Sequence, residues 1–255
     1  MVRKFAAFLF VGLMLTTFDA GAQGTGAHTV AFDGFSLAFD AALARNVNIS
    51  QYAGDPADLG PGFAEPPHTQ LTFYDAFPVP ESILDAVGGI RVYRTADFDG
   101  FAEHESRLAA LQSLLAERPD LAEFEALHTE DMNANALPFI PVFPAAQVIR
   151  ARTQYLETDA VQGIAYLTIY QEVAEPFERA LWTFQGVSRD SEYYIAAIFN
   201  VSSDVFPEDT SDFEPERMNE YRAKMVAWLN QADPASFAPA LPLLEAVVQS
   251  FAFEG

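Results

Sequence analysis

The sequence predicts an α+β fold, in which helices pack on an antiparallel sheet of about five to seven strands. Four strand-like segments follow one another in the second half of the chain, and the short turn-prone links between them favour antiparallel neighbours. Helical segments with an apolar face lie before and after this strand-rich region. A chain of 255 residues is also long enough to bury a core of its own.

The first 22 residues have the three parts of a secretory signal peptide. Arg3 and Lys4 precede an uncharged apolar run over residues 5–18, and Ala20 and Ala22 give the small-residue pattern of a cleavage site. The apolar run is shorter than the about 20 residues that a membrane-spanning helix needs. We therefore expect cleavage after Ala22 and export to the periplasm or the medium. A retained N-terminal anchor is the alternative that the sequence leaves open.

The chain is acidic and free of cysteine. It has 14 basic and 36 acidic residues, a formal net charge of −22. This charge argues against binding to nucleic acid, whose phosphates require a basic surface, and against anionic lipid headgroups. Without disulfides, an exported domain depends on its core alone. We expect residues 23–255 to form a single α+β domain with no stable membrane insertion, whose partner is an unknown protein or a small-molecule ligand.

The first half of the mature chain is predicted to contain short strands and one helix. Residues 30–39 read as two strands around a turn, and the Pro- and Gly-rich residues 52–68 read as a surface loop. Residues 69–74 and 90–94 are further strand candidates. Leucines on one face, with Pro119 just beyond, predict a helix over residues 106–117.

The second half supplies most of the predicted sheet. After a loop at 128–144, strands are expected at 146–156, 161–171, 181–187 and 193–201. An acidic loop at 202–216 separates them from a helix over 216–231. A last helix over 242–250 leads into Phe251-Ala252-Phe253.

Two resemblances follow from these segments. The sequences at 148–151, 163–168, 183–186 and 193–194 resemble an uncharacterised family of exported bacterial proteins, for which no activity is established. The ending at 244–251, in which a helix runs through Ser-Phe into a strand, resembles the close of PsbP/Mog1-like α/β/α sandwiches. That second resemblance implies a hairpin at the start of the domain and a non-enzymatic binding or accessory role. The long segment at 99–145 departs from its pattern.

No motif in the sequence fixes a reaction. The histidines at 28, 68, 104 and 128 lack metal-ligand spacing, and the chain has no Gly-x-Ser-x-Gly, dinucleotide-binding or P-loop motif. A calcium-like start at Asp131 fails, because Ala136 and Val142 stand where the loop needs Gly and Glu. The acidic residues of 204–216 are typical of a solvated surface. We therefore expect no catalytic residues, no metal and no cofactor, and we favour a protein that is not an enzyme.

The candidate ligand-binding residues lie on three consecutive predicted strands. Arg150 and Arg152 are two apart, which on a regular strand places both side chains on one face. Pairing with carboxylates inside the protein is the favoured explanation, and an anionic ligand is the alternative. If the register aligns, the neighbouring strands add polar and aromatic groups to a face able to hold a small anion or a glycan. These groups are Tyr166, Thr168, Tyr170, Thr183 and Gln185.

Three functions remain open from the sequence. The leading one is a non-catalytic extracytoplasmic binding or accessory module. The second is an extracytoplasmic hydrolase with paired carboxylates, which would require two converging acids, one with a raised pKa. The third is a structural component of the cell envelope.

Overall fold

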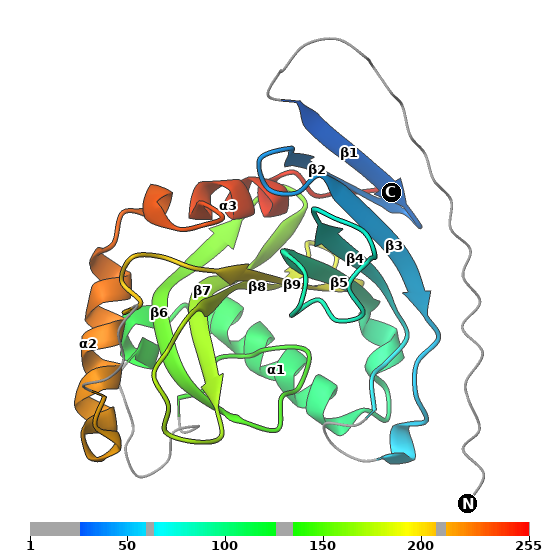
Figure 1. Ribbon diagram of the computed structural model, residues 1–255. Helices are drawn as coiled ribbons and strands as arrows, with labels where there is room; N and C mark the ends of the chain where they lie inside the picture. Colours follow the sequence, from blue (N-terminus) through cyan, green and yellow to red (C-terminus); the bar gives the residue numbers. More distant parts are fainter. Residues whose placement is uncertain (1–25, 60–63, 126–134, 208–212, 255) are drawn as a thin grey trace, which may run out of the picture.

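The computed structural model describes residues 26–59, 64–125, 135–207 and 213–254, and a seven-stranded sheet runs through its centre (Figure 1). Every neighbouring pair in this sheet is antiparallel, in the order β3-β4-β5-β9-β8-β7-β6. The predicted fold class is therefore confirmed. The strands are β3 (Asn46–Tyr52), β4 (His68–Tyr74), β5 (Gly88–Arg94), β6 (Ala146–Glu157), β7 (Val161–Gln171), β8 (Ala180–Ser188) and β9 (Tyr193–Val201).

The four strands expected in the second half pair in sequence order, as their short links predict. The sheet continues across β9 to β5, so the segment between residues 95 and 145 must return the chain from β5 to the far edge at β6. Strand β3 was not predicted. It is an edge strand whose residues are half-buried or exposed, so it lacks the nearly continuous burial of inner strands such as β8 and β9.

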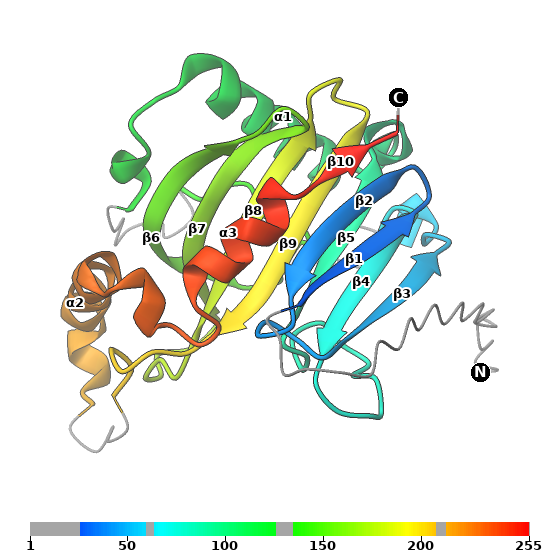
Figure 2. The same cartoon turned by 90° about the horizontal axis from the view of Figure 1, so that it is seen from above.

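One face of the main sheet is covered by a small sheet and a helix (Figure 2). Strands β1 (Ala27–Phe32), β2 (Phe35–Asp40) and β10 (Ala252–Phe253) form the small sheet, and helix α3 (Leu241–Gln249) lies beside it. Four apolar side chains of α3 are buried in a core that includes Trp182 and Phe199. The N–H of Ala38 donates to Ser250 Oγ at 2.8 Å, which fastens the end of α3 to β2.

The opposite face carries a second core beneath helix α1 (Ala102–Glu117) (Figure 1). Leu111 is fully buried there among Tyr166, Tyr194 and Ile140. The helix predicted from residue 106 begins four residues earlier, and its first turn brings the buried His104 towards the sheet. This face holds the polar clusters described below.

Helix α2 (Met218–Gln231) packs against β6, at the opposite end of the sheet from β3. Within the ranges described above, no helix is long and apolar enough to span a membrane. The predicted signal peptide at 1–22 lies outside those ranges.

Candidate functional site

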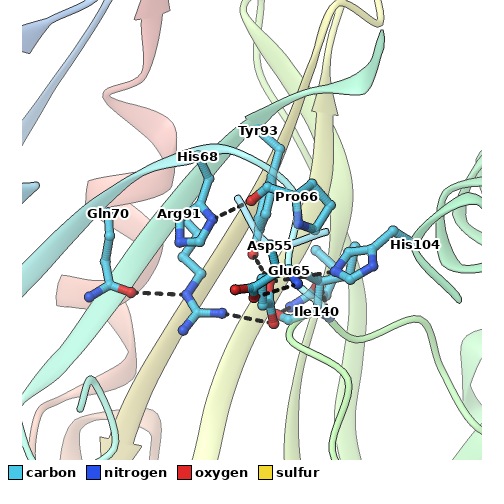
Figure 3. Close-up of polar contacts among 10 residues, drawn as sticks. Asp55, Glu65, Pro66, His68, Gln70, Arg91, Tyr93, His104 and Ile140 are labelled. Carbon is cyan, nitrogen blue, oxygen red and sulfur yellow. Dashed lines mark hydrogen bonds and ion pairs between the residues drawn. The ribbon is translucent and has the colours of Figure 1, made fainter. Parts of the chain in front are cut away.

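Ionisable and polar side chains gather on the α1 side of strands β4 and β5 (Figure 3). We call this group the Glu65 cluster, and its centre is a carboxylate from the loop before β4. Side chains two apart on a strand share a face, and Gln70 of β4 pairs in register with Arg91 of β5. The members are Glu65, His68, Gln70, Arg91, Tyr93 and His104.

The carboxylate of Glu65 connects three parts of the fold. Its Oε1 lies 3.2 Å from Nη1 of Arg91, and its Oε2 accepts a hydrogen bond from the Tyr93 hydroxyl at 3.1 Å. Nε2 of His104, from α1, lies 3.5 Å from the same Oε2, at the outer limit of hydrogen bonding. Figure 3 shows the guanidinium of Arg91 between Glu65 and Gln70, whose Oε1 accepts from Nε of Arg91 at 3.0 Å.

Two hydrogen bonds between Asp55 and Glu65 hold the loop that carries the Glu65 carboxylate. The N–H of Asp55 donates to the Glu65 carbonyl at 2.9 Å, and the N–H of Glu65 donates to Oδ2 of Asp55 at 3.1 Å. These two bonds, one to a backbone carbonyl and one to the Asp55 carboxylate, hold the loop from which the Glu65 side chain extends. Its side chain keeps an exposed fraction of 24%, so the cluster reaches the surface.

Burial and neighbouring charge set the charge states of the central pair. Burial opposes the ionisation of Glu65, but His104 and the charge of Arg91 outweigh it, so the pKa of Glu65 lies below its ordinary value. Burial also opposes the charge on Arg91, and the neighbouring Tyr93 and Glu65 reverse that effect, so the pKa of Arg91 is raised. Each charge thus holds its partner ionised.

His68 is held neutral. Burial is the main cause that lowers its pKa to about 4, and the nearby charge of Arg91 adds to it. Its Nδ1 lies 2.9 Å from the carbonyl oxygen of Pro66, which identifies Nδ1 as the protonated nitrogen, and its ring packs between Tyr52 and Tyr93. Burial raises the pKa of Tyr93, and burial together with Asp55 raises the pKa of Tyr52 to about 12. At neutral pH His68, Tyr93 and Tyr52 are therefore all uncharged.

A carboxylate-based hydrolase requires two converging acids, one with a raised pKa, and a metal site requires several ligating side chains close together. Among the described residues, the carboxyl groups whose pKa values shift are Glu65, Asp190 and Glu220, and all three shift downwards. Across the described residues, no three His, Asp or Glu side chains gather as metal ligands. His128 and the start of the calcium-like segment at Asp131 lie outside the described residues.

The structure brings most of the predicted ligand-binding face together. Tyr166 lies opposite Thr183, and Arg150 lies opposite Thr168, so the register aligns. The segment 136–143 covers this face: the Tyr166 hydroxyl donates to the Pro138 carbonyl at 2.7 Å. Tyr166, Thr168 and Gln185 are consequently buried.

Gln185 is the centre of this second polar group. Its Oε1 accepts from the N–H of Ile140 at 3.0 Å and from the Tyr194 hydroxyl at 2.7 Å. Its Nε2 donates to Oγ1 of Thr183 at 2.8 Å.

The other two predicted residues of β7 also have partners. The hydroxyl of Thr168 donates to the carbonyl of Ile149 at 2.8 Å, and the Tyr170 hydroxyl accepts from Nε2 of Gln147 at 3.1 Å.

The two strand arginines do not share a face, so that expectation is wrong. A β-bulge between Ala151 and Gln154 interrupts the alternation, and Arg152 has a left-handed φ of 53°. Arg150 is buried and donates to the carbonyls of Phe124 and Gln147, at 2.5 and 2.7 Å. Arg152 turns to the end of α2, where its Nη1 donates to the carbonyls of Leu229 and Ala232 at 3.0 and 2.6 Å.

Sequence reasoning missed the Glu65 cluster. A signal was present: His68-x-Gln70 and Arg91-x-Tyr93 place polar groups at alternate positions of otherwise apolar strands. Glu65 lay in a segment read only as a loop, and the paths that bring it and His104 to these strands depend on tertiary structure.

Comparisons with known proteins add no relative: no family model matches the chain, and no curated protein or solved structure is significantly similar to it.

Proposed function

We propose that the mature part of this chain is an exported, non-catalytic binding or accessory module. The observation that carries the proposal is the pairing within the Glu65 cluster, in which Glu65 contacts Arg91 and Tyr93, and His68 contacts a backbone carbonyl. Glu65 and Arg91 stay charged at neutral pH, and His68 stays neutral. A general acid or base works best when its pKa lies near the operating pH, so these three groups suit a rigid polar framework better than proton transfer.

Two features of the sequence support export and an accessory role. The signal-like residues 1–22 predict secretion. The resemblance of the ending at 244–251 to PsbP/Mog1-like domains favours a role in binding another protein or a small ligand. N-terminal sequencing of the exported protein is expected to begin at Gln23, whereas a membrane-bound form that begins at Met1 would favour the anchor.

A hydrolase is the second candidate, and one contact favours it. The carboxylate of Glu65 lies beside the imidazole of His104, and such a carboxylate can orient a histidine that acts as a base. However, the side chain of His104 is only 3% exposed and is surrounded by the rings of Tyr93, Phe98 and Phe101. A substrate could reach it only after this packing opens.

Hydrolysis assays separate the two candidates. The purified protein is incubated with chromogenic esters, glycosides and phosphate esters, beside the variants Glu65→Gln and His104→Gln. We expect the wild-type protein to show no turnover above that of either variant. Turnover by the wild type that both variants lose, while their circular dichroism spectra match the wild type, would establish the hydrolase and overturn the proposal.

A further inference from the structure

A cavity of about 190 Å3 lies between helix α1, the segment 136–147 and strand β7. It is on the sheet face that carries the predicted polar residues, and Tyr170 is the member of that set that lines it. The other charged, polar or aromatic residues that line the cavity are Arg107, Phe139, Phe143 and Gln147. Its volume exceeds the about 150 Å3 of an apolar cavity that binds benzene.

Three aromatic rings form one wall of the cavity. The ring centres of Phe139 and Phe143 are 5.3 Å apart, and each lies 5.0 Å from the ring centre of Tyr170. The mutual contacts hold the rings in place, so the wall is formed before a ligand arrives. Such a surface suits a compact apolar or aromatic body.

The polar end of the cavity offers hydrogen-bond donors. Among the described residues, Nε of Arg107 is buried and has no hydrogen-bond partner, and Nη2 of the same guanidinium lies 3.7 Å from Glu103 on the exposed side of α1. The Tyr170 hydroxyl accepts from Gln147 and, among the residues that the structure describes, has no acceptor for its own hydrogen. Burial keeps this hydroxyl protonated by raising its pKa, against the nearby positive charge of Arg107.

We propose that this cavity binds a small organic anion, a carboxylate attached to a compact aromatic or branched apolar body. The carboxylate lies against the guanidinium of Arg107 and accepts from the Tyr170 hydroxyl, and the body lies against the three rings. Arginine suits this role because its charge is permanent and its N–H groups match carboxylate geometry. The inference rests on the proposed function, since it names the ligand class of a binding module.

The charge of the lining selects against other small ligands. A cation would face the guanidinium of Arg107 and would find no carboxylate among the residues that line the cavity. A neutral alcohol would use the same donors without the charge of the carboxylate, and hydrogen bonds between charged partners are about twice as strong. An anion of this size is therefore expected to bind best.

Benzoate is the probe for the test, with benzylamine and benzyl alcohol as compounds of similar size and different charge. Each is titrated into the purified full chain by isothermal titration calorimetry. We expect benzoate to saturate one site, and benzyl alcohol and benzylamine to bind at least about tenfold more weakly. Absence of saturable benzoate binding, or equal binding of benzylamine, would overturn the proposal.

Three variants locate the site. Arg107→Met keeps an unbranched apolar stem and removes the charged guanidinium, and Tyr170→Phe removes one hydroxyl. We expect a loss of benzoate affinity of about tenfold or more for Arg107→Met and of several-fold for Tyr170→Phe. The matched control is Arg217→Met, which removes one exposed arginine just before α2 and is expected to bind as the wild type does.

Each outcome has a defined meaning. Wild-type affinity in Arg107→Met would overturn the cavity as the site, even if benzoate binds elsewhere. The proposed function fails by a different measurement, the appearance of Glu65-dependent turnover, so the two failures are distinguishable. A melting curve of each variant shows whether a loss of affinity reflects a loss of folding.

Discussion

The main sheet buries polar groups in two different ways on the same face. Near β4 and β5, a carboxylate and a guanidinium neutralise each other and remain close to the surface, with exposed fractions of 24% for Glu65 and 17% for Arg91. Near β7 and β8, the neutral amide of Gln185 is fully buried. It accepts a hydrogen bond from the N–H of Ile140 and donates one to the carbonyl of Ile140. The first arrangement depends on charge, and the second depends on hydrogen-bond geometry alone.

The stability that the first group contributes is expected to depend on pH, whereas that of the second group is expected to depend on its hydrogen-bond partners. A charged pair loses its attraction when one partner is neutralised, so its contribution to stability follows pH. A neutral amide network has no titrating member in the accessible range and breaks only when a partner is removed. The ligand cavity lies beside the second group, where the protein has already replaced water with fixed donors and acceptors. Three changes test this contrast, and a fourth tests the separation of Arg150 from Arg152.

Gln185→Leu is expected to have the largest effect. It leaves the N–H of Ile140 and the hydroxyl of Tyr194 buried without their partner, and each unsatisfied group costs about 1–3 kcal/mol. We expect the free energy of unfolding in urea to fall by about 4 kcal/mol, equally at pH 5 and pH 8. The control Gln51→Leu, at an exposed position of β3, should change it by less than about 0.5 kcal/mol. A loss that varies with pH would contradict the neutral account.

Glu65→Gln is expected to destabilise the protein by about 2–3 kcal/mol at pH 7, because it leaves Arg91 charged and poorly paired. The pKa of Glu65 is lowered in the folded state, so its contribution is complete above the ordinary value and is lost as the pH falls through the folded value. Urea unfolding at a series of pH values should therefore show the wild-type and variant curves converging in acid. A constant difference down to pH 2 would contradict the charged pair.

His68→Phe isolates a pH effect of about 2 kcal/mol. The folded pKa of His68 is about 4 and its ordinary value is 6.5, so between these values the unfolded chain binds a proton that the folded chain does not. The wild type should lose about 2 kcal/mol between pH 7 and pH 5 from this group, and the variant should not. His28→Phe, on the exposed side of β1, serves as the control and should keep the wild-type slope. If the pH dependence of stability were the same in His68→Phe as in the wild type, the pKa of His68 would not differ between the folded and the unfolded chain, which contradicts the prediction.

Arg152→Met is expected to have the smallest effect, a loss of about 1 kcal/mol in unfolding free energy. The guanidinium donates to carbonyls at the C-terminal end of α2, where cations are favourable. Because Arg150 and Arg152 have separate contacts, the losses of Arg150→Met and Arg152→Met should add in the double variant. A strongly non-additive double variant would mean that the two guanidinium groups interact.

The sequence was informative where burial repeats along a strand. The four strands at 146–156, 161–171, 181–187 and 193–201 were recognisable from β-prone residues bounded by turn-prone links, and the helix at 106–117 from leucines that recur on one face. Strand β3 was not recognisable, since it is an edge strand whose residues are half-buried or exposed. The sequence did not fix the register that places Tyr166 opposite Thr183, and the polar face was expected only if that register occurred.

The candidate sites were less accessible to sequence reasoning because tertiary contacts build them. Glu65 and His104 come from a loop and a helix start, and nothing in their local sequence places them beside Arg91. A single bulge was enough to separate Arg150 from Arg152, since one extra residue reverses the alternation of a strand. The arginine of the cavity, Arg107, belongs to α1 and was read only as part of a helix.

Two-dimensional 1H–15N correlation spectra of the protein, recorded during a titration with benzoate, test the central claim most directly. The account predicts saturable shifts for the amides around residues 107, 139–147 and 170, with the signals of residues 65–70 and 91–93 unchanged. Shifts centred on the Glu65 cluster, or no saturable shift in any region, would contradict it.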